Sequence, residues 1–299
     1  MTAPVALPRD VSRAVRVTVP AAEAELAADA LWQAGAVAIE ERAAPGGTVV
    51  LVAGGPAGGG GAGPGRDGTE RLLAAAAGRW PAEVEEVDLG AALDAWRAFA
   101  RPVRVGRRLV VRPPWVPASA GGGDVGRSEV TIDPGRAFGS GAHPSTRLAL
   151  AALDGQVAGG ERVLDVGCGS GVLAVAALAL GAAAALAVDV DPAALAATRA
   201  NADRNGVAAA LATAATVDAA PAGRHDLVVA NMLLPQLVAL APQVAAAVAP
   251  GGTVVLSGLL VDQLPGALAA YGAAGLAPVA GEEGGHVEDG WVALSLRPA

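Results

Sequence analysis

The stretch that decides the fold lies near the middle of the chain and reads RVLDVGCGSGVLAVAALAL at residues 162–180. Apolar residues on both sides of Asp165 predict a buried strand, and the apolar run that begins at Val172 predicts a helix. Glycines occupy alternate positions between them, at 167, 169 and 171. Because glycine adopts backbone conformations that other residues avoid, this run lets the chain turn tightly and approach a ligand closely. The stretch therefore predicts a strand, a ligand-binding loop and a helix.

Strands and helices alternate around this stretch, from about Val125 to the end of the chain. Strands are predicted at 162–166, 185–190, 225–230, 253–257 and 292–296, and helices at 147–153, 172–180, 192–205, 235–248 and 262–271. This alternation predicts an α/β domain in which helices cover both faces of a parallel sheet. Ligands bind such sheets beyond the carboxyl ends of the strands, where the strand order reverses. We expect the glycine loop to lie at that point.

Two polar residues stand at the ends of other predicted strands. Asp189 lies 22 residues after Gly167, where a carboxylate accepts hydrogen bonds from both hydroxyls of a ribose. S-adenosylmethionine and NAD share that requirement, and the competing role of a helix cap suits Asp191 better. Asn231 closes the strand at 225–230, and its amide both donates and accepts hydrogen bonds. A simple turn is the competing role for this asparagine.

The first ninety residues predict a separate, smaller domain. Its predicted elements are a strand at 15–19, a helix at 21–34, strands at 37–42 and 48–53, a helix at 69–77 and a strand at 82–87. This order is the split arrangement of α+β ferredoxin-like domains. Glycine dominates residues 54–68 and predicts a loop. Because no histidines, cysteines or paired carboxylates cluster here, we expect either partner recognition or a purely structural role.

Residues 91–124 connect the two domains and are expected to pack against them. Trp96, Phe99 and Trp115 lie here among six arginines, in a chain with only 3% aromatic residues. Interleaved arginine and tryptophan also occur on RNA-binding surfaces, but the alternation of apolar residues over 103–111 favours an ordinary strand. Three glycines at 121–123 then predict a flexible break. The chain is therefore divided into a domain at 1–90, a connector at 91–124 and a domain at 125–299.

Composition argues against several classes of protein. The net charge of -8 and the pI near 4.9 disfavour nonspecific binding of nucleic acid, which depends on basic residues that neutralise phosphates. The single cysteine, Cys168, excludes an intramolecular disulfide, and three widely spaced histidines give no metal signature. The longest apolar stretch, 171–188, follows a glycine turn and ends at Asp189, so a helix and a strand explain it better than a membrane span. Without a signal-peptide pattern at the N-terminus, we expect a cytoplasmic protein.

A second informative segment, DPGRAFGSGAHPST at 133–146, lies upstream of the glycine loop. It resembles the D-P-G-x-A-F-G-T-G-x-H-P-T-T segment of the PrmA family, the bacterial methyltransferases of large-subunit ribosomal protein L-eleven (L11). The D-x-G-x-G-x-G run at 165–171 likewise resembles the first motif of class I methyltransferases. The similarity continues in order through residues 163–174, 189–192, 201–202, 204–207, 229–231, 250–252 and 256–258. The connector from Trp96 to Trp115 also resembles the linker of that family.

The resemblance implies a class I, Rossmann-like methyltransferase domain and S-adenosylmethionine as the cofactor. The family's cofactor contacts correspond to Thr146, Gly167, Asp189 and Asn231, and Gly169 lies in the same loop. The implied substrate is ribosomal protein L11, methylated on amino groups of lysine side chains and of its N-terminus. The implied role of the first domain is recognition of this protein substrate.

The chain departs from the pattern of the family in three places. Ser140 and Ser145 replace threonines and keep a hydroxyl, whereas Met232-Leu233-Leu234 replaces Ile-Leu-Ala and alters the wall beside the acceptor amine. Ser145 or Thr146 is expected to cap the helix at 147–153. His143 is expected to shape its loop or contact the substrate, ahead of a role in removing the proton of a lysine ammonium. Alignment supplies much of the acceleration of an in-line methyl transfer, so Asn231 is expected to position the reacting groups and no dedicated base is assigned.

Three other functions stay open at this point. A nucleobase or a small molecule as acceptor would keep the chemistry, although Asn231 is not followed by the Pro-Pro-aromatic pattern of many enzymes that methylate planar nitrogens. A nicotinamide-dependent oxidoreductase would need the same ribose-binding carboxylate. A noncatalytic ribosome-assembly factor would bind the cofactor without turnover.

Overall fold

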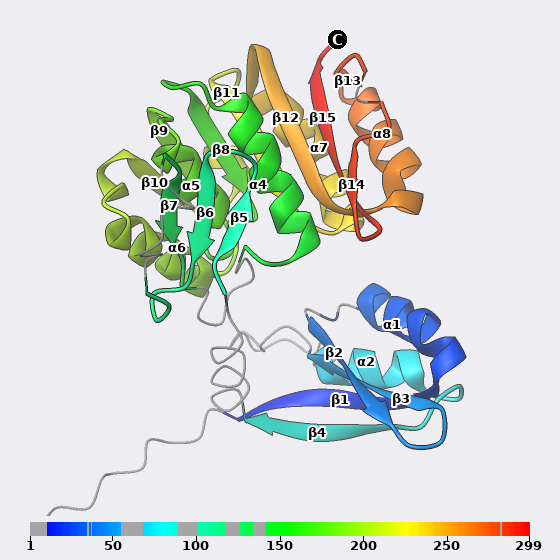
Figure 1. Cartoon of the computed structure of the whole chain (residues 1–299). Coiled ribbons are helices and arrows are strands. Elements are labelled where there is room, and N and C mark those ends of the chain that lie inside the picture. Colours follow the sequence, from blue (N-terminus) through cyan, green and yellow to red (C-terminus); the bar gives the residue numbers. More distant parts are fainter. Residues whose placement is uncertain are drawn as a thin grey trace, which may run out of the picture. The chain divides into compact units, whose positions relative to one another are not determined.

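The computed structural model describes residues 11–34, 36, 38–54, 68–88, 101–117, 126–133, 141–281 and 283–299 (Figure 1). The chain divides into two compact units, Met1–Phe99 and Ala100–Ala299. Parts of the sequence prediction fall outside the described residues: most of the glycine-rich loop, the glycine break at 121–123, Trp96, Phe99 and Ser140.

The first unit contains an antiparallel sheet and two helices. Its elements are β1 (Val11–Pro20), the short 3-10 helix η1 (Ala21–Glu23), α1 (Ala24–Gln33), β2 (Ala38–Ala44), β3 (Thr48–Gly54), α2 (Gly68–Ala76) and β4 (Ala82–Asp88). They follow the predicted order of strands and helices, and the strands lie side by side as β2-β3-β1-β4. Alternate residues of β1, from Val15 to Val19, share one core with Leu31 of α1 and Leu72 of α2. Both helices therefore cover the same face of this sheet.

The second unit is built on a larger sheet. Its strands are β8 (Arg162–Val166), β9 (Ala184–Val188), β10 (Leu211–Ala214), β11 (His225–Asn231), β12 (Val248–Leu260), β13 (Leu276–Pro278), β14 (His286–Glu288) and β15 (Trp291–Pro298). They lie in the order β10-β9-β8-β11-β12-β15-β13, and β14 pairs with β15. The strand order reverses between β8 and β11, because the chain passes from β8 to β9 on one side and reaches β11 on the other side only later.

The sheet is mixed, so the predicted parallel arrangement holds only in part. Strands β10, β9, β8, β11 and β12 pair in parallel. Strand β15 runs antiparallel to β12, β13 and β14. The turn Asp289–Gly290 joins β14 to β15, and a connection this short joins only antiparallel strands. The α/β class is confirmed, and the prediction of a parallel sheet is wrong only at the edge formed by β13, β14 and β15.

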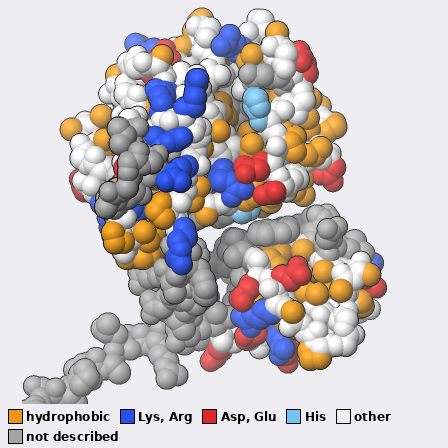
Figure 2. Space-filling model, in the orientation of Figure 1, with side chains coloured by type: hydrophobic (Ala, Val, Ile, Leu, Met, Phe, Trp, Pro, Cys, Tyr) orange, Lys and Arg blue, Asp and Glu red, His pale blue; other side chains and the backbone are white. Residues whose placement is uncertain are grey.

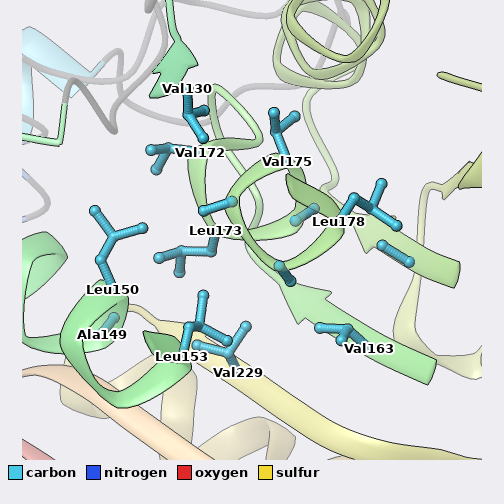
Figure 3. Close-up of a cluster of buried hydrophobic side chains, with 14 of the residues drawn as sticks. Val130, Ala149, Leu150, Leu153, Val163, Val172, Leu173, Val175, Leu178 and Val229 are labelled. Atoms are coloured by element: carbon cyan, nitrogen blue, oxygen red, sulfur yellow. The ribbon is translucent and has the colours of Figure 1, made fainter. Parts of the chain in front are cut away.

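Helices cover both faces of the sheet, as predicted. They are α4 (Pro144–Gln156), α5 (Val172–Ala179), α6 (Pro192–Arg204), α7 (Leu234–Ala247) and α8 (Leu264–Ala273). Neighbouring residues of β8 enter different cores: Val163 packs with α4 and α5, and Leu164 packs with α7 and α8. Figure 3 shows part of the first of these cores, which contains Leu150 and Leu153 of α4, Leu173 of α5 and Val163 of β8. Burial on both faces explains why these strands read as continuous apolar runs.

The connector contains a hairpin where one strand was predicted. Strands β5 (Val103–Val105) and β6 (Leu109–Arg112) pair antiparallel, and β7 (Ser128–Thr131) pairs in parallel with β6. The chain reverses at Gly106, whose φ of +54° suits a residue without a side chain. The carboxylate of Asp154, on α4, accepts hydrogen bonds from the backbone N–H groups of Arg107 (2.8 Å) and Arg108 (3.2 Å). The turn is thus held by a residue about 46 positions away, which no local pattern reveals.

Short elements account for the remaining differences. The sequence prediction missed β7, β10, β13 and β14, which have three or four residues each. Alanine and glycine around them give little of the alternation that identifies a strand. The prediction of a helix and a strand in the longest apolar stretch is confirmed by α5 and β9. None of the helices in the described part of the chain is long and apolar enough to cross a membrane.

The anchor of the hairpin can be tested by the substitution Asp154→Ala. The side chain of Asp154 is only 7% exposed and also pairs with the guanidinium of Arg108 at 3.0 Å, so its loss leaves two backbone N–H groups of the turn without their charged acceptor. We expect the free energy of unfolding, measured in urea, to fall by roughly 2–3 kcal/mol. The control is Glu129→Ala, which removes the carboxylate from Arg112 but leaves that arginine several backbone acceptors; it should cost less than about 1 kcal/mol. Equal losses in the two variants would contradict this account.

Candidate functional site

The glycine loop lies at the predicted place, where the strand order reverses between β8 and β11. Gly167, Gly169 and Gly171 have φ values of +72°, +53° and +78°. A Cβ on Gly167 would lie 2.8 Å from the side chain of Met232, and a Cβ on Gly171 would lie 2.7 Å from that of Thr198. Both the backbone conformation and the lack of space therefore require glycine at 167 and 171.

The loop is attached to the neighbouring strand β9. The N–H groups of Gly167 and Cys168 both donate to the carbonyl oxygen of Val188, at 2.8 and 3.0 Å. The N–H of Gly169 donates to Oδ2 of Asp189 at 3.0 Å. Asp189, which the sequence singled out for ribose binding, therefore also helps to fix the loop.

Asp189 and Asp191 have different tasks, as the sequence indicated. Asp191 caps α6, because its carboxylate accepts a hydrogen bond from the N–H of Ala193 at 2.8 Å. Asp189 accepts from the N–H groups of Gly169 and Asp191. A carboxylate offers about four acceptor positions, so Asp189 retains capacity for other donors. Between the two aspartates lies Val190, whose apolar side chain is 85% exposed.

A third carboxylate, that of Asp165, is fully buried next to the loop. Its Oδ2 accepts a hydrogen bond from the N–H of Ala174 at 3.0 Å, and its Oδ1 has no hydrogen-bond partner among the described residues. Burial, together with a smaller contribution from the charge of Asp189, raises the pKa of Asp165 from its ordinary value of 3.8 to about 7. Burial also raises the pKa of the Cys168 thiol, so this cysteine stays protonated and is a poor nucleophile.

The structure brings Asn231 and Thr146 together, although 85 residues separate them. Nδ2 of Asn231, at the end of β11, donates to Oγ1 of Thr146 at 3.3 Å. The start of α4, which carries Thr146, is fixed to the sheet because Oγ of Ser257 donates to the carbonyl oxygen of Ser145 at 2.8 Å. The N–H of Met232 donates to the carbonyl oxygen of the same Ser257 at 3.1 Å.

His143 caps α4, and the prediction that Ser145 or Thr146 is the cap is wrong. The helix begins at Pro144, so both hydroxyl residues lie inside its first turn, and Nδ1 of His143 accepts from the N–H of Ser145 at 3.3 Å. The imidazole stands edge-on to the ring of Trp291, with 4.8 Å between centroids. Burial lowers the pKa of His143, and the positive charge of Arg147 lowers it further. The ring is therefore mostly neutral at pH 7, and the engagement of its Nδ1 with Ser145 suits the loop-shaping role.

The hairpin of β14 and β15 supports this helix start through contacts that the sequence did not predict. The guanidinium of Arg147 contacts the carboxylates of Glu288 (2.6 Å) and Asp289 (3.2 Å). Together with Trp291, these residues tie the last strand of the sheet to α4. A pattern search fails to find such contacts because the partners lie about 140 residues apart.

The residues proposed from the sequence thus lie on one side of the sheet, at the carboxyl ends of its parallel strands. The N–H of Gly169 in the loop bonds directly to Asp189, and Asn231 at the end of β11 contacts Thr146 of α4. Within the described ranges, no group of three or more His, Cys, Asp or Glu side chains is arranged to hold a metal ion. The site therefore offers carboxylates, backbone groups and an amide.

This fold and this site define a Rossmann-like α/β domain of the methyltransferase class. Residues 72–298 match the family "Ribosomal protein L11 methyltransferase (PrmA)", and the chain belongs to that family. It is 44% identical over 221 residues to a ribosomal protein L11 methyltransferase from Symbiobacterium thermophilum. The alignment covers 74% of this chain and 68% of that protein. It is also 40% identical over 205 residues to the protein of the same name from Pelotomaculum thermopropionicum. This alignment covers 68% of this chain and 64% of that protein. The aligned part of this chain thus spans about two thirds of the length of these relatives.

A solved structure supports the same assignment. The crystal structure of ribosomal protein L11 methylase from Lactobacillus delbrueckii subsp. bulgaricus has a TM-score of 0.60 and 30% sequence identity to this chain. The similarity covers 66% of this chain and 98% of that one.

The buried carboxyl predicts a specific pH dependence of stability. Between the ordinary pKa of 3.8 and the folded value of about 7, the unfolded chain releases the proton of Asp165 while the folded chain keeps it. The stabilisation is therefore complete below pH 4 and is lost as the pH rises towards 7. We expect urea unfolding without cofactor to show a free energy that falls by up to about 1.4 kcal/mol per pH unit in this window.

The matched variant for this prediction is Asp165→Asn, whose side chain does not titrate. Its carbonyl oxygen can still accept from the N–H of Ala174. The difference in unfolding free energy between the original chain and the variant should therefore change between pH 5 and pH 7, in favour of the variant at the higher pH. An unchanged difference across this range would refute the raised pKa.

Proposed function

We propose that this chain is an S-adenosylmethionine-dependent protein methyltransferase that methylates amino groups of ribosomal protein L11. The acceptors would be lysine side chains and the N-terminal amine. The observation that carries the proposal is the contact between Asn231 and Thr146 beside the glycine loop, in a chain of the PrmA family. It places a fixed amide next to a loop that fits the cofactor.

The residues around the loop fit S-adenosylmethionine. The three left-handed glycines give a backbone surface with no side chain between it and a ligand. Asp189 has acceptor capacity for the two ribose hydroxyls, and the exposed Val190 beside it offers an apolar surface for the adenine ring. We therefore assign cofactor binding to Thr146, Gly167, Gly169, Asp189 and Asn231. The cofactor, when bound, supplies a methyl group on a positively charged sulfur.

The chain itself contributes alignment of the acceptor amine. The amide of Asn231 is held by Thr146, so its remaining hydrogen-bonding capacity points in a fixed direction. Nδ1 of His143 is engaged with Ser145, which favours a positioning role over that of a base. A lysine ammonium has to lose its proton before it attacks, and transfer from water into an apolar site lowers its pKa of about 10.4. We thus propose that the chain accelerates methyl transfer by orienting the acceptor amine and removing water from it, without a dedicated base.

The first unit is proposed to be a ferredoxin-like domain that recognises the protein substrate. Its strand order β2-β3-β1-β4 with two helices on one face supports this topology. The opposite face of its sheet carries ion pairs between Arg16 and Glu83 and between Arg42 and Glu85. Figure 2 shows acidic and basic side chains close together on this unit. Such a mixed surface suits a charged protein better than a membrane or a uniformly anionic nucleic acid.

The proposed boundaries are 1–90 for this domain, 91–124 for the connector and 125–299 for the methyltransferase domain. Strands β5 and β6 of the connector contribute Val105 and Leu109 to the core of the second unit, so the connector is in part an extension of the methyltransferase domain. A cytoplasmic location would follow from a ribosomal protein substrate.

The substrate proposal is tested by incubation of the purified chain with S-adenosylmethionine and isolated L11. Mass spectrometry of the intact protein and of its peptides should show added methyl groups on lysines and on the N-terminal residue. The variant Asn231→Ala should lower turnover roughly 100-fold, because the acceptor loses its alignment. Methylation of another acceptor with L11 unmodified would overturn the substrate, and binding of NAD in place of S-adenosylhomocysteine would overturn the enzyme class.

The cofactor site is tested by a pair of aspartate variants. Asp189→Ala removes the proposed ribose partner, and the affinity for S-adenosylhomocysteine in calorimetric titration should fall at least about tenfold. Asp191→Ala removes only the cap of α6. It should cost about 1 kcal/mol of stability and leave the affinity within about threefold. A larger loss of affinity in Asp191→Ala than in Asp189→Ala would contradict the assignment.

A further inference from the structure

One face of α6 is turned towards the glycine loop and carries three polar residues. Thr198, Asn201 and Asn205 are three and four positions apart, so they lie on the same side of the helix. Thr198 and Asn201 are fully buried. Oγ1 of Thr198 donates to the carbonyl oxygen of Gly169 at 3.1 Å. This helix begins directly after Asp191, so it is continuous with the segment that carries Asp189.

Asn201 joins two segments that are far apart in the sequence. Its Nδ2 donates to the carbonyl oxygen of Ser170 in the glycine loop and to that of Asp133 just beyond β7, both at 2.9 Å. Its Oδ1 accepts from the N–H of Asp133 at 3.0 Å and from the guanidinium of Arg204. All four hydrogen-bonding positions of the amide are thus used. Only a side chain with two donors and two acceptors meets this demand.

Asn205, one turn further along α6, contacts the same strand but not the loop. Its Oδ1 accepts from the N–H of Thr131 at 2.8 Å, and its Nδ2 donates to the carbonyl oxygens of Thr131 and Asn201, both at 2.7 Å. The two asparagines therefore share the attachment of β7 to α6. Of the two, Asn201 is the one whose side chain also bonds to the glycine loop, at Ser170.

The hydrogen bonds from α6 fix the backbone of the loop, which its glycines cannot do because they have no side chains. Peptide units are planar, so fixing a carbonyl oxygen fixes the whole unit. Thr198 fixes the unit that follows Gly169, Asn201 fixes the unit that follows Ser170, and Asp189 fixes the N–H of Gly169. A glycine-rich backbone is otherwise free to sample many conformations, and that freedom opposes ligand binding.

We infer that Asn201 is a positioning residue of the cofactor site, which holds the glycine loop in its binding conformation through Ser170. The inference rests on the proposed function, since the loop is assigned to S-adenosylmethionine. Asn201 makes no contact with the ligand in this assignment. It acts through the backbone of Gly169 to Gly171, and at the same time it fixes the loop to the end of β7 at Asp133.

The test compares Asn201→Asp with Asn205→Asp in the full-length chain. Each change replaces an amide nitrogen, which donates to two carbonyl oxygens, by an oxygen that repels them. Both should lower the melting temperature, because both weaken the attachment of β7. Only Asn201→Asp should lower the affinity for S-adenosylhomocysteine at least tenfold in calorimetric titration, with Asn205→Asp within threefold of the original chain. In methylation assays the KM for S-adenosylmethionine should rise while the KM for L11 stays unchanged.

The serine variants Asn201→Ser and Asn205→Ser keep the comparison usable where an aspartate variant does not fold, because the smaller side chain lets water reach the same groups. Asn201→Ser should again bind S-adenosylhomocysteine more weakly than Asn205→Ser, with a change in log affinity about half that expected for the aspartate variants. Folded Asn201 variants that bind S-adenosylhomocysteine as tightly as their Asn205 counterparts would overturn the inference and leave the proposed function intact. An original chain that fails to bind S-adenosylhomocysteine would overturn both.

Discussion

The backbone between β8 and α5 has to take a left-handed conformation at three alternate positions while it passes close to the side chains of Met232 and Thr198. Glycine satisfies both conditions and no other residue does. The same choice leaves the loop without side chains of its own to hold it in place. Its shape therefore depends on partners elsewhere, which are the carbonyl of Val188, the carboxylate of Asp189 and the polar face of α6. The rest of the site is arranged around this loop.

Burial of the sheet on both faces brings these partners to the right place. Each central strand packs against helices in front and behind, which sets the order of the strands and puts β8 next to both β9 and β11. Because the parallel strands end on the same side, Asp189 follows one neighbour and Asn231 ends the other. Thr146 joins them because α4 packs on the sheet through Leu150 and Leu153. Apolar packing thus determines where each polar group of the site lies.

The sequence predicted the parts of the fold that depend on long apolar runs. The four parallel strands β8, β9, β11 and β12, and the helices α5 to α8, follow such runs, whereas the hairpin at Gly106 and the strands β13 and β14 do not. At the site, residues at the ends of strands could be predicted, because a residue that directly follows a predicted parallel strand must lie at the edge of the sheet where ligands bind. Thr198, Asn201 and Trp291 could not, because each acts through a contact with a distant segment and follows no period. The capping role of His143 was missed, and Ser145 or Thr146 was predicted in its place, because histidine is outside the usual preference for Ser, Thr, Asp and Asn at this position.

The loop also distinguishes between the two cofactors that a ribose-binding carboxylate permits. In dinucleotide-binding domains the pyrophosphate sits on the free N–H groups at the start of the helix that follows the glycines. Here two of those groups, at the first and third positions of α5, are engaged by the chain itself: the N–H of Val172 by Ser170 and that of Ala174 by Asp165. The carboxylate of Asp189, which contacts the loop, would also repel a pyrophosphate. A cofactor with a positively charged sulfur and an ammonium group meets neither obstacle, and this carboxylate attracts it. The electrostatics of the loop thus favour S-adenosylmethionine over NAD, which the glycine spacing alone could only suggest.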